Sequence, residues 1–355
     1  RQMSIFSRHP KDYVGKWFEQ RRKLGLSDTI HWARYSPETD CLKFDKFQHA
    51  NGDGLSIIKH LLTETGYGHI KLPTCKENGL PTKERLISIK KNSQPYPKKI
   101  NWLFWKTDRS LSENLLVALS FSKEDTTRIE QRAQSLNIPI ATLVLWALNR
   151  AVAKNLLEKK QEYTWMYPVN LRGAVTLDTD YANYSSGFYL PVTEDISIQD
   201  LQQRIRQKLK SGEHWINWQQ ANIARYLPGI VIRWIYKFIS KRYYYAGNFS
   251  AMGNWFSQED LTSETASPQE IIDKELWFGF EPSTKNYPVS ASSITWSDQL
   301  VLTLKLHSSI IKNNNTTVET IFAWGEGLLE NFIISPEEAK KQKRLITYSY
   351  SPGAT

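Results

Sequence analysis

The segment His49-Ala50-Asn51-Gly52-Asp53-Gly54 separates two stretches of different periodicity. Before it, residues 41–47 alternate apolar and polar side chains, which is typical of a half-buried strand. After it, apolar side chains stand at positions 55, 57, 58, 61 and 62, which is helical spacing. The Asn-Gly pair breaks both patterns. The sequence therefore predicts a strand, a tight turn and a helix, with His49 at the end of the strand.

His49 has the side chain that acid–base chemistry near neutral pH uses most often. At a strand end, a rigid sheet would hold its backbone while the turn leaves the ring at a cleft. Asp53 follows the turn and could fix it, and Gly52 and Gly54 permit the tight backbone path. Considered alone, the hexapeptide fits an ordinary surface hairpin better, so other segments must decide.

Beyond this turn, strands and helices are mixed without strict alternation. Such a mixture indicates α/β or α+β layers and excludes an all-parallel barrel. A polar, Lys- and Pro-rich stretch at residues 71–99 predicts a loop or linker. The predicted strands are 115–121, 164–169, 188–192, 275–280, 290–296 and 300–307, and the predicted helices are 122–136, 141–157, 198–209 and 318–332.

The formal charge of +10 arises from 46 Lys and Arg against 36 Asp and Glu, and it favours anionic partners. We expect no nucleic acid among them, because no zinc-finger spacing or RNA-binding signature is present. Basic and aromatic side chains interleave between Ile223 and Tyr245, a composition suited to an anionic membrane surface. Ordinary packing with snorkelling basic stems is the favoured account of that stretch.

Two cysteines, Cys41 and Cys75, form no Cys-x-x-Cys pair or His/Cys cluster, so we expect neither a disulfide framework nor a metal site. No apolar run reaches the length of a membrane span, and the N-terminus lacks a signal-peptide core. We therefore expect a cytoplasmic protein, with association to a membrane surface as an alternative.

Four segments, in order, resemble motifs of the chloramphenicol acetyltransferase-like superfamily, which includes peptide-synthetase condensation domains, plant BAHD acyltransferases and bacterial wax ester synthases. The hexapeptide resembles the HxxxDG motif. Gln48 stands where many condensation domains have a second His, and Ala251 where the crossover strand has Asn. The other three segments are similar to a downstream strand motif, a Tyr-Gly-Asn-type segment and a Ser-Asn-x-Gly crossover strand; they are Tyr167-Pro168-Val169-Asn170-Leu171-Arg172-Gly173, Asn183-Tyr184-Ser185-Ser186-Gly187-Phe188 and Gly247-Asn248-Phe249-Ser250-Ala251-Met252-Gly253.

The resemblance implies an α/β fold of two domains, with mixed sheets, flanking helices and an active-site tunnel between the domains. We place the first domain, which carries HxxxDG, at residues 1–110 and the second at residues 111–355. Fewer than fifty residues precede the motif, so the sequence leaves open whether the first domain is complete.

The resemblance also implies residue roles. His49 would be the general base, and Asp53 would be structural, paired with Arg172 because a guanidinium can hold a carboxylate with two hydrogen bonds. Gly54 completes the catalytic segment. Ser250 is a candidate oxyanion donor, with an ordinary strand serine as the equal alternative. The residues expected to line the acceptor or donor tunnel are Asn170, Asn183 and Asn248.

The function that the resemblance implies is transfer of an acyl group from a thioester to a hydroxyl or amine. The thioester would be acyl-CoA or an acyl group on the phosphopantetheinyl arm of an acyl carrier protein, with no tightly bound cofactor, and we expect a monomer. The alternative is a degenerate member that binds a carrier or lipid at a membrane surface without catalysis. Catalysis requires His49 to face an open tunnel, whereas the degenerate form predicts a blocked one.

Overall fold

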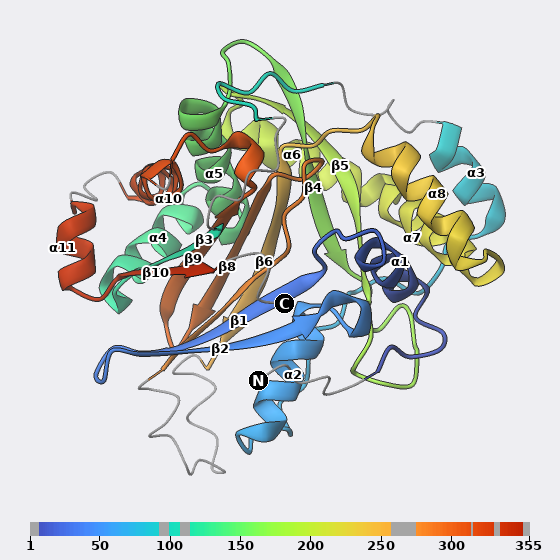
Figure 1. Cartoon of the computed structure of the whole chain (residues 1–355), viewed down its shortest axis with the longest axis horizontal. Helices are drawn as coiled ribbons and strands as arrows, with labels where there is room; N and C mark the ends of the chain where they lie inside the picture. Colours follow the sequence, from blue (N-terminus) through green and yellow to red (C-terminus); the bar gives the residue numbers. More distant parts are fainter. Residues whose placement is uncertain are drawn as a thin grey trace.

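The computed structural model describes residues 7–91, 99–106, 114–256, 275–313, 315–329 and 334–350. Two sheets form its centre (Figure 1). The smaller is antiparallel, with the order β2-β1-β7, and consists of β1 (Thr29–Ser36), β2 (Cys41–Gln48) and β7 (Leu276–Phe280). The predicted boundary between residues 110 and 111 lies outside the described residues.

The larger sheet has seven strands in the order β10-β3-β9-β8-β6-β4-β5. It is mixed, because β6 runs parallel to both β4 and β8 while the other pairs are antiparallel. Its strands are β3 (Asn114–Ser120), β4 (Glu162–Asn170), β5 (Ser185–Thr193), β6 (Gly247–Trp255), β8 (Val289–Trp296), β9 (Gln299–Leu306) and β10 (Leu345–Tyr350).

Helices flank the sheets, with α4, α5 and α10 on one side of the large sheet and α1, α7 and α8 together at the other end of the molecule (Figure 1). The helices are α1 (Tyr13–Arg22), α2 (Gly54–Glu64), α3 (Lys83–Lys91), α4 (Lys123–Ser135), α5 (Ile140–Leu156), α6 (Ile198–Ser211), α7 (Glu213–Asn222), α8 (Gly229–Ser240), α10 (Asn315–Leu328) and α11 (Pro336–Lys341). Three short 3-10 turns, η1 (His49–Asn51), η2 (Ile223–Tyr226) and η3 (Ser308–Ile310), connect them.

The two faces of β3 show how the layers pack. Leu115, Val117 and Leu119 belong to the core shared with α4, α5 and α10, whereas Leu116 and Ala118 belong to the core shared with the small sheet. Alternate residues of a strand point to opposite faces, so one continuous apolar run serves both layers. The large sheet therefore lies between a helical layer and the small sheet.

Most predicted strands and helices are present within a few residues of their predicted ends, but the segment from 71 to 99 is not only a loop. It contains α3 at Lys83–Lys91, whose few apolar side chains pack on α7. Leu86 and Ile89 are buried there beside Trp215 and Trp218. Tertiary contact, which overrides weak local preference, therefore decides this helix.

The aromatic, basic stretch around α8 also differs from the expectation of ordinary packing. Ile230, Trp234 and Phe238 are 58%, 75% and 54% exposed, and their spacing places them on one side of the helix. Ile232 is the buried residue of α8. The helix thus packs through a narrow stripe and presents a row of large apolar side chains outward.

In the described part of the chain, no single helix has the length and apolarity to cross a membrane, and the one pair that would pass together, Lys123–Ser135 with Ile140–Leu156, is bent by 99°.

Candidate active site

The turn after β2 has the geometry that the sequence predicts. β2 ends at Gln48, His49 begins η1, and Asp53 caps α2 by accepting a hydrogen bond from the Ser56 amide at 3.0 Å. The His49 amide donates to the Asp28 carbonyl at 2.8 Å, which fixes the backbone of the histidine. The turn therefore ends a strand and begins a helix within five residues.

Gly54 lies close to the side chain of Met252. A Cβ added to Gly54 would lie 2.4 Å from Cε of Met252, which belongs to β6. The start of α2 therefore lies directly against the crossover strand. The absence of a side chain at Gly54 brings the motif close to the large sheet.

Asp53 forms a buried, two-pronged ion pair with Arg172. Nη1 of Arg172 donates to Oδ2 at 2.9 Å, and Nη2 donates to Oδ1 at 2.6 Å. The Ser56 hydroxyl, the Tyr184 amide and the Ser185 hydroxyl also donate to this carboxylate, at 3.1, 3.0 and 3.1 Å. Every oxygen of the buried carboxylate therefore has at least two partners, as a buried charge requires.

The electrostatics of Asp53 follow from these partners. Burial acts to raise the pKa of the carboxyl group, but the charge and hydrogen bonds of Arg172 outweigh it, and the pKa is lowered. Asp53 is therefore a carboxylate at neutral pH. It contacts structural groups from three segments, which suits a positioning role and not proton transfer.

His49 is held through Asn183, a residue with no exposed surface. Nδ1 of His49 lies 2.9 Å from Oδ1 of Asn183. Nδ2 of Asn183 donates to Oδ2 of Asp12 and to the carbonyl of His49, both at 2.9 Å, and the Asn183 amide also donates to Asp12. Asp12 in turn caps α1 by accepting from the Gly15 amide at 2.6 Å. A chain of hydrogen bonds thus runs from α1 to the imidazole.

This chain assigns the proton on the His49 ring. Because both hydrogens of the Asn183 amide are directed at acceptors, its oxygen must face Nδ1, and that nitrogen must carry the proton. Nε2 then has a free lone pair. Among the described residues no group hydrogen-bonds to Nε2, so this nitrogen has no competing partner for proton transfer.

Phe18 covers one face of the His49 ring. The ring centroids are 3.8 Å apart and the planes differ by 13°. Phe18 belongs to α1, the helix that Asp12 caps. One short helix therefore supplies both the stacking partner and the carboxylate that orients the histidine.

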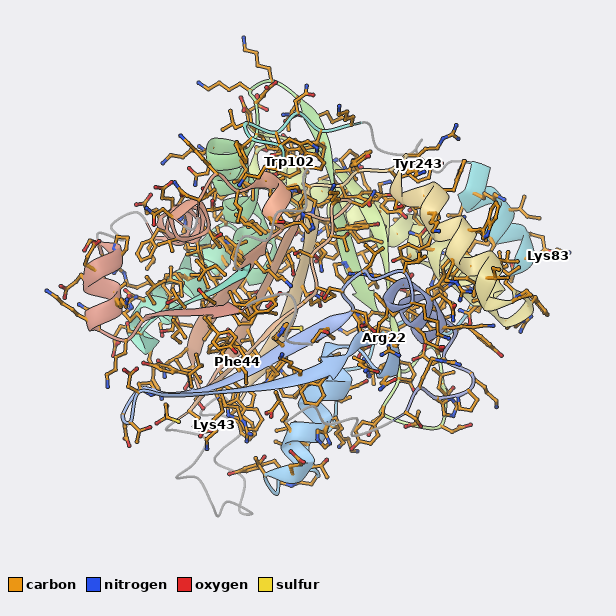
Figure 2. The ribbon with its side chains drawn as sticks, viewed as in Figure 1. Arg22, Lys43, Phe44, Lys83, Trp102 and Tyr243 are labelled. Atoms are coloured by element: carbon orange, nitrogen blue, oxygen red, sulfur yellow. The ribbon has the colours of Figure 1, made fainter. Side chains whose placement is uncertain are left out.

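A cavity of about 1470 Å³ lies beside the histidine, and both sheets and helices α1, α7 and α8 contribute to its wall. The wall includes Phe18 and Gln48, which adjoin His49, but not His49 itself. Figure 2 labels two wall residues, Arg22 at the end of α1 and Tyr243 just after α8. The cavity has the volume for a substrate with a long or bulky body, since ordinary ligand pockets measure roughly 300–1,000 Å³.

Two of the asparagines expected to line the tunnel have other places. Asn170 donates to the Pro73 carbonyl at 2.8 Å and accepts from the Arg172 amide at 3.1 Å. Asn183 holds His49, as described above. Neither is on the cavity wall. A buried side-chain amide forms hydrogen bonds with the polar groups around it. The motif alone does not show which groups these are.

Ser250 and Asn248 both bind Glu281, a residue that the sequence did not single out. The Ser250 hydroxyl donates to Oε1 at 2.8 Å, and the Asn248 side-chain amide donates to Oε2. Neither residue hydrogen-bonds to His49 or lies on the cavity wall. Glu281 follows β7, so this cluster ties the crossover strand to the small sheet.

Asp12 and Phe18 are two further residues of the site that were not predicted from the sequence. Asp12 stands three residues before Gly15 at the start of a helix, a spacing that signals a cap. Its contact with Asn183, 171 residues away, has no local signal. The same holds for the stacking of Phe18 on His49, because only the folded chain brings the two rings together.

The fold is similar to that of a solved nonribosomal peptide synthetase, and two further structures show a weaker likeness. A nonribosomal peptide synthetase, FmoA3 (S1046A), matches with a TM-score of 0.50 and 12% identity over 84% of this chain and 32% of that chain. The epimerization domain from the third module of tyrocidine synthetase B has a TM-score of 0.48 and 13% identity over 81% of this chain and 68% of that one. The condensation domain from the Monacolin K polyketide synthase MokA has a TM-score of 0.48 and 13% identity over 78% of this chain and 66% of that one.

The expected fold is confirmed. The mixed α/β architecture, with two sheets and flanking helices, is the one implied by the resemblance to the chloramphenicol acetyltransferase-like superfamily. The chain spans about a third of the FmoA3 chain, 32% of its length. No family model and no curated protein matches the sequence. Identities this low carry the fold and leave the chemistry to the site itself.

Replacing Arg172 by Met is expected to destabilise the fold by about 3–5 kcal/mol, because it leaves the Asp53 carboxylate buried without its cation. Urea denaturation followed by Trp fluorescence measures the loss. The matched control is Arg128→Met, which removes an exposed partner of Asp125 and should cost less than about 1 kcal/mol. Equal losses in the two variants would contradict a special role for the buried pair.

Replacing Asn183 by Ala is expected to let His49 populate both tautomers, since Nδ1–H loses its acceptor. Long-range ¹H–¹⁵N NMR at alkaline pH, where the imidazole is neutral, reports the tautomer directly. Asn217→Ala, which removes a side chain bonded to the Gly187 carbonyl, should leave the His49 signals unchanged. A His49 that keeps one tautomer in Asn183→Ala would refute the assignment.

Proposed function

We propose that the protein transfers an acyl group from a thioester to a hydroxyl or amine, with His49 as the general base. The donor is acyl-CoA or an acyl group on the phosphopantetheinyl arm of an acyl carrier protein. One observation carries the proposal: Nδ1 of His49 lies at hydrogen-bond distance from the oxygen of a fixed amide, which assigns the lone pair of the neutral ring to Nε2. A general base needs this state before it can accept a proton.

The proposed reaction begins when Nε2 takes the proton of the acceptor as its oxygen or nitrogen attacks the thioester carbonyl carbon. The C=O double bond opens to an oxyanion, and the tetrahedral intermediate collapses as the C–S bond breaks. The imidazolium returns its proton to the departing thiolate. The products are an ester or amide and a free thiol, so atoms and charge balance.

The neighbours of His49 support this cycle. The Asn183 oxygen accepts Nδ1–H throughout, so the ring keeps its orientation as it gains and loses the second proton. The Asp53–Arg172 pair holds the turn and stays out of the proton path. A role for Ser250 as oxyanion donor requires its hydroxyl to leave Glu281, to which it donates.

His49→Ala is expected to lower the rate of acyl transfer by about 10²–10⁴-fold while the protein remains folded. The measurement is thiol release, with intact mass of the products, over a panel of acyl thioesters and simple alcohol and amine acceptors. His69→Ala is the control, because His69 is an exposed histidine without a place in the site. Transfer by folded His49→Ala at the unaltered rate would end the assignment of the base.

The alternative function is binding of a lipid or carrier at a membrane surface without catalysis, and two observations favour it. His49 is not on the wall of the large cavity, and Phe18 covers one ring face. Trp234 on α8 is among the most exposed apolar side chains of the described chain, and Arg233 and Lys237 flank it. Aromatic rings beside basic groups suit the interface of an anionic bilayer.

Trp234→Ser is expected to weaken binding to vesicles of phosphatidylcholine and phosphatidylserine several-fold, because an exposed indole would no longer enter the interface. Vesicle flotation measures the bound fraction. Trp105→Ser is the control, since Trp105 is also exposed but lies outside α8. Equal binding by the wild type and both variants would exclude α8 as a membrane contact. Binding of an acyl thioester with no release of thiol would favour the alternative over catalysis.

A further inference from the structure

Lys305 is a buried cation without a hydrogen-bond partner among the described residues. It lies near the end of β9, is 3% exposed, and is part of the cavity wall. Thr303, on the same face two residues earlier, donates to the Gly279 carbonyl of β7, so this face of β9 is turned toward the small sheet. Nζ of Lys305 lies 5.3 Å from the centroid of the Tyr350 ring, which gives it an aromatic neighbour but no acceptor.

A second buried cation stands near it. The side chain of Arg21 on α1 is 7% exposed, and its Nε and Nη2 are buried without a hydrogen-bond partner. Its guanidinium lies 5.7 Å from the centroid of the Phe18 ring that stacks on His49. Burial, and then the charge of Arg21, lower the pKa of Lys305 to about 7. The positive charge of Arg21 therefore acts on Lys305, and Arg21 itself lies beside the ring that stacks on His49.

The cavity offers these cations little negative charge. Of the described residues on its wall, Asp28 carries the only carboxylate, and burial raises the pKa of that group. Arg22 lies 3.8 Å from it and supplies its counter-charge. The cations on the wall are Arg22, Lys46, Lys106, Lys285 and Lys305. The charge of Arg21, which is not on the wall, also acts on the Asp28 carboxyl group. An unpaired buried charge is costly, so an anion in the cavity would compensate Lys305.

The other residues of the cavity wall indicate which uncharged groups such a molecule carries. Tyr189, Tyr245 and Tyr287 form a stack, with centroid distances of 4.9 and 4.6 Å, and all three are on the wall. Trp17 and Phe18 add further aromatic surface. Aromatic faces favour flat or apolar groups, and a strongly hydrated diphosphate gains little from them.

We infer that the cavity binds a carboxylate with an aromatic or apolar body, whose charged group pairs with Lys305 while its body lies along the stacked tyrosines. The inference rests on the proposed function to the extent that this carboxylate is a substrate, either the acyl acceptor or the acyl group. The carboxylate would compensate the charge of Lys305 with charge-assisted hydrogen bonds.

The test is isothermal titration of the whole chain, without an acyl donor, with cinnamate and octanoate and with the amides of the same two acids. The wild type is expected to bind at least one acid about ten- to hundredfold more tightly than its amide, since hydrogen bonds to a charged group are among the strong ones. Lys305→Met should abolish that preference. Lys106→Met, which removes a less buried cation from the same wall, should keep it.

Folding of the variant is checked by its melting temperature. Lys305→Met is expected to melt above the wild type at pH 6, because it removes a buried charge. This gain in melting temperature should shrink toward pH 9. The pKa of Lys305 is about 7 in the folded protein and ordinary in the unfolded chain. The folded wild type therefore loses the buried charge as pH rises through 7, and its stability approaches that of the variant. His31 and His307 stay neutral in this window, because burial, and next the charge of Lys305, lower their pKa to about 3 and about 4.

Three outcomes would overturn the inference. They are equal affinity for acid and amide in both pairs, equal losses in Lys305→Met and Lys106→Met, and binding of phosphopantetheine, but of neither carboxylate, that depends on Lys305. Because no donor is present, a protein that binds carboxylates but never transfers acyl groups would refute only the proposed function. A protein that transfers acyl groups and ignores carboxylates would refute only this inference.

Discussion

The buried ion pair between Asp53 and Arg172 is the interaction on which the site depends. It joins the turn after β2 to the segment after β4, 119 residues away, and it also anchors the amide of Tyr184. Tyr184 follows Asn183, the residue that orients His49. The pair therefore fixes both sides of the hydrogen bond that sets the imidazole. A carboxylate that takes no part in proton transfer still determines where the proton can go.

The buried charges of Asp53 and Lys305 differ in how they are compensated. Asp53 has a bidentate cation and four further donors, so its charge is stabilised by the fold itself. Among the described residues, Lys305 has an aromatic ring nearby and no hydrogen-bond or ion-pair partner. The first arrangement is what structural charges require, whereas the second leaves unsatisfied donors that a bound molecule can use. Both charges are buried, so their hydrogen-bond and ion-pair partners are what distinguish a structural charge from one that a ligand can use.

Local pattern carried much of the fold. The alternation before His49 and the apolar spacing after it predicted β2 and α2, and Ser122 predicted the cap of α4. The order of four motifs then indicated the architecture. What could not be predicted depends on contacts between distant segments. α3 exists because it packs on α7, and Phe18 meets His49 only because α1 lies against the turn. In the sequence Lys305 resembles any other lysine of a strand, and its burial follows only from the folded structure.

The small sheet takes its third strand from the far end of the chain, since β7 at Leu276–Phe280 pairs with β1 along residues 31–35. During synthesis, β1 and β2 emerge more than 200 residues before the strand that completes them. Until then β1 presents a row of unsatisfied amides and carbonyls along an open edge, which is a template for pairing with another chain. The N-terminal part of this protein is therefore a poor candidate for expression alone, and nascent chains that stall before β7 are prone to aggregate.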